Sequence, residues 1–227
     1  MIYEDNESEL YSPAHCNCIY IDENELESFL PTCSASNLNL LHINCRSLNK
    51  NFDKLQNLLD TMKAKFTIIA VTETWLSKTT DELYNLEGYN FTNISRTDKK
   101  GGGVALYIDT SLSFTVVRNL TFIRDNLECL CVTITGIGKL EITIGCIYRP
   151  PTTNYDQFMQ DLNNILNHRI IVNSKLVFIL GDYNIDLLQL DKQSSSTFLD
   201  TMHAHYLYPV IRSLPLPSYR QTNQDHG

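Results

Sequence analysis

The chain has 227 residues, of which 43% are hydrophobic, and it carries a formal net charge of −8. No apolar stretch approaches the roughly 20 residues that cross a bilayer, and the N-terminus lacks the basic and apolar regions of a secretory signal. Seven scattered cysteines without paired C-x-x-C spacing indicate free thiols in a reducing environment. We therefore expect an intracellular protein, in the nucleus or the cytoplasm, that is neither secreted nor bound to a membrane.

The negative charge is confined to the first 36 residues. Eight of the 26 acidic residues and none of the 18 basic residues lie there, so 18 of each remain in the rest of the chain. We interpret residues 1–36 as an acidic leader and linker of low order, and residues 37–227 as one domain. A domain of balanced charge is not a general DNA-coating protein, although its basic loops can still contact phosphates.

From residue 38 onward, strand patterns alternate with helical patterns. Strands are predicted at 38–43 and 66–71, and apolar residues from Phe52 to Met62 recur at helical spacing between them. A β-rich middle follows, with predicted strands at 103–108, 113–117, 128–134 and 140–148. Residues 135–139 carry a hairpin signal between the last two of these strands.

The last third of the chain alternates helix and strand again. Asn154 and Gln157 have the spacing of a capping box, which predicts a helix with an apolar face. A buried strand is predicted before Asp182, and a final helix near residues 195–206. The whole pattern indicates a mixed α/β domain in which two packed β-sheets carry helices on their outer faces.

The run from Val177 to Asp186 is the most informative stretch, because its apolar strand ends abruptly in Asp182 and Asn184. Alternation along a strand places these two side chains together at its carboxyl end, where open α/β sheets bind their ligands. A carboxylate and a carboxamide in this arrangement suit the binding of water, phosphate or a hard cation. A simple turn is the alternative, since Gly, Asp and Asn all favour turns.

Polar groups also follow three other predicted strands. These segments are NCRSL at 44–48, TETWL at 72–76 and CIYRPP at 146–151. Polar ends on four strands that lie far apart in the sequence are what a cleft at one edge of a sandwich requires.

In their order and spacing, these segments resemble the endonuclease/exonuclease/phosphatase superfamily, which includes pancreatic deoxyribonuclease and apurinic-site endonucleases. TETWL, GGGVALYI at 101–108, CIYRPP and GDYNIDLL at 181–188 most resemble its branch in non-LTR (LINE-type) retrotransposons. The resemblance covers about residues 37–222 and implies a deoxyribonuclease-like, four-layer fold. It also implies a hydrolase that uses Mg²⁺ (or Mn²⁺) to nick double-stranded DNA, with a reverse transcriptase domain encoded downstream as its partner.

By this resemblance, Glu73 is the principal Mg²⁺ ligand, and Asn44 supports the metal or binds the scissile phosphate. Asp182 orients or deprotonates the attacking water, while Asn184 donates to a phosphate oxygen. Tyr148 places its hydroxyl near the phosphate. Each also has a plainer interpretation: Glu73 as a surface or helix-terminal residue, Asn44 as a strand end, and Tyr148 as an ordinary strand aromatic.

Contacts to DNA are expected for Arg96, Lys99, Lys100, Arg149, Arg220 and Thr222. The first three form a basic loop before 101–103 that meets the DNA backbone or is simply a solvated turn. The last two resemble the family's Pro-Thr-Arg segment near the DNA groove, with Ser218-Tyr219 in place of part of it.

The sequence departs from the family pattern after this segment. Family members continue with a strand that bears an Ile-Asp pair and with a last strand that ends in Ser-Asp-His. Asp225-His226 does not match this pair, because no apolar strand precedes it and it follows Asn184 too soon. We therefore expect the family's Asp-His pair and last strands to be missing, which leaves a sheet edge or apolar face uncovered. Two other functions remain open: a non-catalytic remnant or binding module of the same fold, and a phosphomonoesterase.

Overall fold

The computed structural model describes residues 38–62, 65–77, 81–97, 100–137, 140–187, 189 and 191–210. The expected leader, Lys99, and the segment that holds Arg220, Thr222 and Asp225-His226 lie outside these residues. The chain divides into two compact units, of which the larger contains the described residues up to Ile185 and the smaller the described residues from Asp186 onward.

The first sheet of the larger unit has the strand order β1-β2-β4-β3. Its strands β1 (Leu40–Asn44) and β2 (Ile68–Thr72) run parallel, because α2 (Leu48–Met62) returns the chain to the end where β1 began. The strands β3 (Tyr89–Ile94) and β4 (Val104–Asp109) complete the sheet in antiparallel pairs. Every residue of the inner strands β2 and β4 is buried.

The second sheet follows the order β5-β7-β8-β9, with β6 paired to β7. Its strands are β5 (Ser113–Val116), β6 (Phe122–Ile123), β7 (Glu128–Ile137), β8 (Leu140–Tyr148) and β9 (Leu176–Asp182). Strands β7 and β8 pair as an antiparallel hairpin, as predicted, whereas β8 and β9 run parallel. The connection between these parallel strands contains α3 (Tyr155–Leu166) and α4 (Arg169–Asn173).

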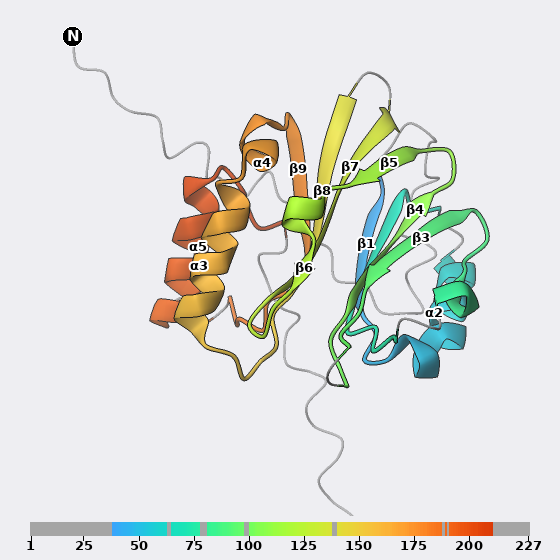
Figure 1. The fold of residues 1–227 in the computed structure, drawn as a ribbon, viewed down its shortest axis with the longest axis horizontal. Helices are drawn as coiled ribbons and strands as arrows, with labels where there is room; N and C mark the ends of the chain where they lie inside the picture. Colours follow the sequence, from blue (N-terminus) through green and yellow to red (C-terminus); the bar gives the residue numbers. More distant parts are fainter. Residues whose placement is uncertain are drawn as a thin grey trace, which may run out of the picture. The chain divides into compact units, whose positions relative to one another are not determined.

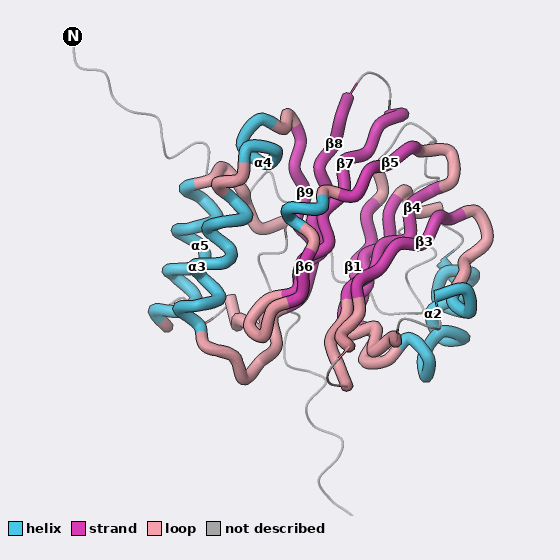
Figure 2. The backbone as a smooth tube through the Cα atoms, in the orientation of Figure 1, coloured by secondary structure: helices cyan, strands magenta, loops and turns pink. Residues whose placement is uncertain are grey.

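Side-chain alternation divides the first sheet between two cores. On its inner face, Ile68 and Leu106 pack in one core with Ile144 of the second sheet. On its outer face, Val71 belongs to a core that includes Leu55 of α2. Figure 1 shows the two sheets face to face, with α2 outside the first and α3 outside the second, and Figure 2 separates these layers by colour. The predicted two-sheet sandwich with outer helices is therefore confirmed.

The helix boundaries follow local signals. Asn154 caps α3 as predicted, because its Oδ1 accepts a hydrogen bond from the backbone N–H of Gln157 at 3.0 Å. In the smaller unit, α5 (Gln193–Ala204) is the predicted last helix. The sequence patterns did not predict β3, β6, α4 or the short 3-10 helices η2 (Asp81–Tyr84) and η3 (Arg118–Leu120).

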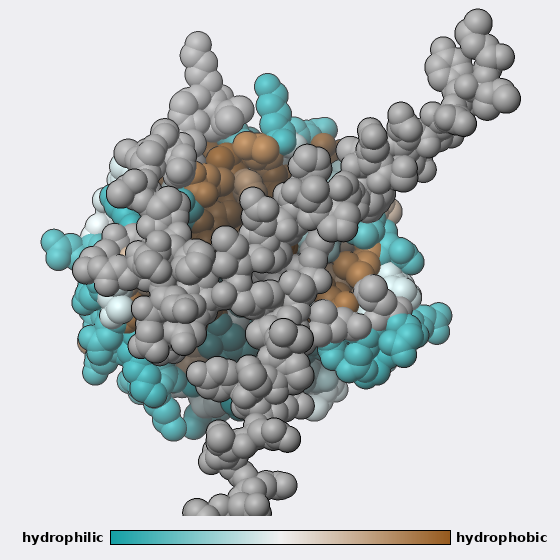
Figure 3. Space-filling model, turned by 180° about the vertical axis from the view of Figure 1, so that it is seen from behind, coloured by the Kyte–Doolittle hydropathy of each residue, from teal (hydrophilic) through white to brown (hydrophobic). Residues whose placement is uncertain are grey.

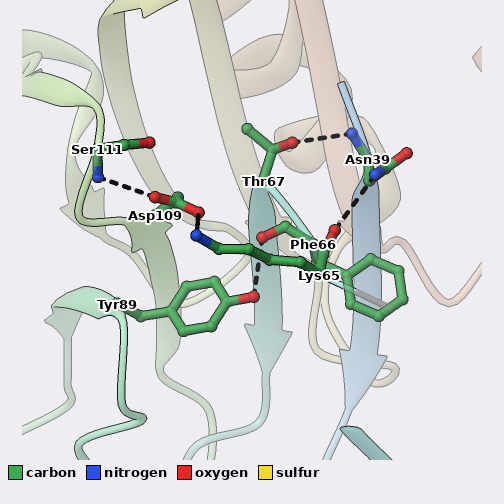
Figure 4. Close-up of polar contacts among 7 residues, drawn as sticks. All are labelled: Asn39, Lys65, Phe66, Thr67, Tyr89, Asp109 and Ser111. Atoms are coloured by element: carbon green, nitrogen blue, oxygen red, sulfur yellow. Dashed lines mark hydrogen bonds and ion pairs between the residues drawn. The ribbon is translucent and has the colours of Figure 1, made fainter. Parts of the chain in front are cut away.

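A polar network closes the end of the first sheet where β2 begins (Figure 4). Lys65 Nζ lies 2.5 Å from Asp109 Oδ2, and the Tyr89 hydroxyl donates to the Phe66 carbonyl at 2.8 Å. Burial opposes ionisation of Asp109, but hydrogen bonds from Lys65 and Ser111 outweigh it and hold the pKa of this carboxyl below its ordinary value. These contacts close the end of the sheet at which β1 and β2 begin.

Strands β1 and β9 are edge strands within the described part of the chain, because β1 pairs there only with β2, and β9 only with β8. All five residues of β1 are partly exposed, and Leu176 at the start of β9 is exposed. Figure 3, seen from behind, shows apolar residues reaching the surface beside polar ones. Within the described residues, no helix has the length and apolar character needed to cross a membrane.

Candidate active site

The candidate site lies where the parallel strands of both sheets end. Asn44 closes β1 opposite Thr72 of β2, and Tyr148 closes β8 opposite Asp182 of β9. Because β1 and β9 also contact each other, these two pairs of strand ends lie side by side. The four polar segments noted in the sequence thus meet at one edge of the sandwich.

Asn44 links two carboxylates at this edge. Its side-chain nitrogen donates to Glu73 Oε1 at 2.9 Å and to Asp182 Oδ2 at 2.6 Å. An amide nitrogen carries two hydrogens, so one Asn side chain satisfies both acceptors. Residues of both sheets, 138 positions apart, are thereby joined, and two carboxylates are held on either side of one amide.

Glu73 sits on a strained segment that follows β2. Its φ is +54° and that of Trp75 is +53°, in the left-handed region that side chains other than Gly disfavour. A backbone hydrogen bond joins this segment to the loop after β1, where the Glu73 carbonyl accepts from Ser47 N at 2.8 Å. Such strain is retained where the surroundings fix the conformation, which is common at functional sites.

Asp182 and Asn184 make a local turn as well as a contact to the site. Asp182 Oδ1 accepts from Asn184 N at 3.0 Å, and its other oxygen accepts from Asn44. The side-chain amide of Asn184 donates to the Arg149 carbonyl at 2.7 Å, and its φ is +48°. The two interpretations of this motif from sequence are therefore compatible, because one carboxylate fixes the turn and faces the site.

Gly181 lets β9 approach β8 before this turn. A Cβ on Gly181 would overlap the carbonyl oxygen of Ile147, the residue opposite it on β8. The absence of a side chain thus brings Asp182 level with Tyr148 at the strand ends.

Tyr148 is a buried phenol among acidic groups. Burial, with the nearby carboxylates of Glu73, Glu128 and Asp182, raises the pKa of Tyr148 to about 12. The hydroxyl therefore keeps its hydrogen at neutral pH.

His42 is a neighbour of the site that the sequence analysis missed. It precedes Asn44 by two positions on β1, so both side chains point to the same face. One ring nitrogen of His42 lies 3.2 Å from Thr72 Oγ1. Burial lowers the pKa of His42, although the charge of Asp182 acts in the opposite direction. Strand alternation applied along β1 from Asn44 would have identified His42. The same alternation does not reach Asn184, because β9 ends at Asp182 and Asn184 lies in the turn that follows, with a φ of +48°.

Arg149, an expected DNA contact, is directed into the protein. Only 7% of the residue is exposed, and its guanidinium donates to the carbonyls of Tyr183 and Asn184 at 3.2 Å each. It also lies over the rings of Tyr155 and Phe158. The structure thus uses Arg149 to hold the turn that carries Asn184.

The other two expected DNA contacts within the described residues differ from each other. The Arg96 side chain is 9% exposed and forms an ion pair with Glu128, so its charge is turned inward. Lys100 is exposed and lies 5.7 Å from the ring centre of Trp75, two residues after Glu73. Lys100 therefore leaves a cation beside the site.

The oxygen groups of the site match the chemistry of a hard divalent cation. Glu73 and Asp182 offer two carboxylates, which suits Mg²⁺ or Mn²⁺ bound together with substrate phosphate and water. Asn44 turns its NH2 group toward these carboxylates, while its amide oxygen accepts from Arg46 N at 3.3 Å, so here Asn44 supports the carboxylates and is not itself a ligand. In the described ranges, no cluster of three or more His, Cys, Asp or Glu side chains could hold a metal ion. Any metal held here would be bound by the two carboxylates together with substrate and water.

A family model now decides the classification. The model of the endonuclease/exonuclease/phosphatase family matches residues 39–219, which include all the site segments described above. The chain belongs to the endonuclease/exonuclease/phosphatase family. The resemblance to this superfamily is thereby confirmed, and its members include hydrolases of phosphodiester bonds. No curated protein sequence matches the chain significantly.

Solved structures similar to this chain share the family's fold. The AP endonuclease LMAP from Leishmania major is 14% identical with a TM-score of 0.56, over 85% of this chain and 76% of that one. An endonuclease/exonuclease/phosphatase family protein from Bacteroides thetaiotaomicron is 16% identical with a TM-score of 0.54. The match covers 72% of this chain and 66% of the Bacteroides chain, slightly less than two thirds of its length. A 3′ phosphatase from Neisseria, bound to a product DNA hairpin, is 15% identical with a TM-score of 0.51, over 74% of this chain and 71% of that one.

Proposed function

We propose that this family member is a metal-dependent endonuclease that nicks double-stranded DNA, of the type found in non-LTR retrotransposons. The observation that carries the proposal is the pair of hydrogen bonds by which Asn44 joins Glu73 and Asp182. Two carboxylates fixed at one amide are suited to binding a divalent cation and to orienting a water molecule. The DNA hairpin bound by the similar Neisseria phosphatase supports a nucleic-acid substrate.

The position of each group supports the following proposed roles. Glu73, supported by Asn44, would hold Mg²⁺ or Mn²⁺, which when bound polarises the phosphate and stabilises the leaving oxygen. Asp182 accepts the proton of the attacking water or orients it, since its carboxylate is fixed by the turn to Asn184. Tyr148, protonated at neutral pH, donates to a phosphate oxygen, and the second amide hydrogen of Asn184 does the same.

The assignment to a retrotransposon rests on the motif resemblance. TETWL and CIYRPP, which resemble the retrotransposon branch, lie at the strand ends that form the site. This resemblance supports assigning the chain to that branch. We infer that its partner is a reverse transcriptase encoded downstream, and that it reaches DNA in the nucleus. Reading the adjoining coding sequence in the source genome tests the partnership, and a locus without reverse transcriptase motifs contradicts it.

Nicking of supercoiled plasmid in Mg²⁺ tests the activity. Glu73→Gln and Asp182→Asn keep side-chain size and remove one charge each, and we expect each to reduce the nicking rate at least about 100-fold. Asp60→Asn is the matched control, because Asp60 is exposed on α2. EDTA should abolish nicking. A folded wild-type chain that leaves plasmid intact, or that cleaves soluble phosphate monoesters instead, would overturn the proposal.

A further inference from the structure

A fully buried acidic residue lies beside the site without a role in the chemistry above. Glu128 begins β7 opposite Tyr148, and its side chain has no solvent exposure. Its partner is Arg96, whose Nε donates to Glu128 Oε1. Burying two charges is costly, and a well-packed apolar pair is often at least as stable. Stability alone therefore does not explain why Arg96 and Glu128 are buried together, and the contacts that the two side chains make with their neighbours suggest another role.

The pair fixes two glycines of the GGGVALYI motif. The second oxygen of Glu128 accepts from the backbone N–H of Gly103. A Cβ on Gly102 would overlap both Glu128 Oε1 and Arg96 Nε, so this backbone passes directly over the ion pair. Both glycines have positive φ, +66° and +85°, which other residues adopt only with strain. The buried charges and the glycine loop therefore form one interlocked unit.

The glycine loop in turn holds the segment that carries Glu73. Gly103 O accepts from Thr74 N at 3.1 Å, and Gly102 O accepts from Trp75 N at 2.9 Å. These two residues directly follow Glu73, and the left-handed conformations of Glu73 and Trp75 need support from outside the segment. The contacts run without a gap from the ion pair through the loop to the residue after Glu73.

We propose that Arg96 and Glu128 are a positioning pair that sets the place of the Glu73 carboxylate through Gly102 and Gly103. This inference rests on the proposed function, since it concerns the accuracy of the same site. It gives Arg96 a role inside the protein in place of the expected contact to DNA. Misplacing a metal-binding or water-orienting group by about 1 Å costs on the order of 100-fold in rate, so the pair acts on catalysis without touching substrate.

The chain offers an optical probe at this point, because Trp75 is its only tryptophan. We would compare the wild type with Glu128→Gln and with the double variant Arg96→Met/Glu128→Gln, which leaves no unpaired buried charge. Asp161→Asn is the matched control, since Asp161, a buried residue of α3, also forms an ion pair with an arginine, Arg124. Thermal unfolding, Trp75 emission, acrylamide quenching, and nicking as a function of Mg²⁺ concentration would be measured for each.

In both Glu128 variants we expect red-shifted Trp75 emission, stronger quenching, a higher Mg²⁺ requirement and about 10- to 100-fold slower nicking. Asp161→Asn should lower the unfolding temperature and leave Trp75 emission unchanged. If Glu128→Gln does not fold, the double variant decides. A folded Glu128 variant with wild-type emission and wild-type nicking would overturn the proposal, as would an equal spectral change in Asp161→Asn. If the wild type does not nick DNA, the proposed function fails, while the Trp75 measurements still test the positioning.

Discussion

Replacing Asn44 by Asp tests the central contact of the site most directly, because it converts a shared donor into a third negative charge. Asn44 Nδ2 lies 2.9 Å from Glu73 Oε1 and 2.6 Å from Asp182 Oδ2. Two unit charges at about 3 Å repel by about 1.4 kcal/mol in bulk water and by about 5.5 kcal/mol at an effective dielectric constant of 20. Since all three residues are partly exposed, we take the lower value for each of the two pairs. The Asn44→Asp variant should therefore lose about 3 kcal/mol of unfolding free energy.

The assay is thermal unfolding with and without Mg²⁺. A loss of this size lowers the unfolding temperature by about 6–12 °C in a domain of 150–250 residues. Mg²⁺ should restore more stability to Asn44→Asp than it adds to the wild type, because a cation bound among three carboxylates offsets their repulsion. Asn90→Asp, on the exposed face of β3, is the control. If Asn44→Asp without Mg²⁺ is as stable as this control, the reasoning about the site is refuted.

Three further predictions concern single side chains. Tyr148→Phe should slow nicking about 10- to 100-fold. Because the pKa of Tyr148 is raised to about 12, the wild-type nicking rate should show no loss from phenol ionisation between about pH 8 and 10. An inflection in the wild-type pH–rate profile near pH 10 that is absent in the variant would contradict this. Asp109→Asn should lower the unfolding free energy by about 1 kcal/mol at neutral pH, a modest value since Lys65 is exposed to solvent. Because the pKa of Asp109 is lowered, the difference in unfolding free energy between the wild type and Asp109→Asn is present above the ordinary carboxyl pKa of 3.8 and should vanish as the pH falls through the lowered pKa. Urea unfolding at several pH values measures this difference. A difference that persists in acid would argue against a stabilising ion pair between Lys65 and Asp109. Gly181→Ala should cost about 1–3 kcal/mol or more, because its Cβ overlaps the Ile147 carbonyl. An unfolding temperature equal to that of the wild type would contradict the close approach of β8 and β9.

The sequence was sufficient to predict the strands that position the site, for a physical reason. Strand β2 and the edge strand β9 carry short apolar runs, β8 places apolar residues at alternate positions, and the polar residues at their ends mark where these strands leave the core. In contrast, β3 alternates Tyr, Phe and Ile with Asn and Thr at an edge, and its partly exposed residues give a weak pattern. The strand β3 forms because it pairs with β4, a tertiary contact that the residues of β3 do not reveal by themselves.

The cations of the site show where sequence reasoning fails. Arg96, Lys100 and Arg149 look alike as basic residues near family motifs, yet only Lys100 is exposed. The partner of Arg96 is Glu128, 32 residues away, and Arg149 binds backbone carbonyls that become available only in the folded turn. Burial of a cation depends on partners brought close by the fold, so residue type and spacing do not determine it. The expected contacts of Lys99, Arg220 and Thr222 remain predictions.

The link between Asn44 and Asp182 has a consequence for the order of events during synthesis. Contacts between residues distant in sequence form late, because the loop they close must first be ordered. The two carboxylates of the site lie on β9 and just after β2, so a nascent chain contains no complete site until β9 has been made. Under the proposed function, partly synthesised or half-folded molecules would not cleave DNA, and nicking activity would measure docking of the two sheets as directly as a spectroscopic probe.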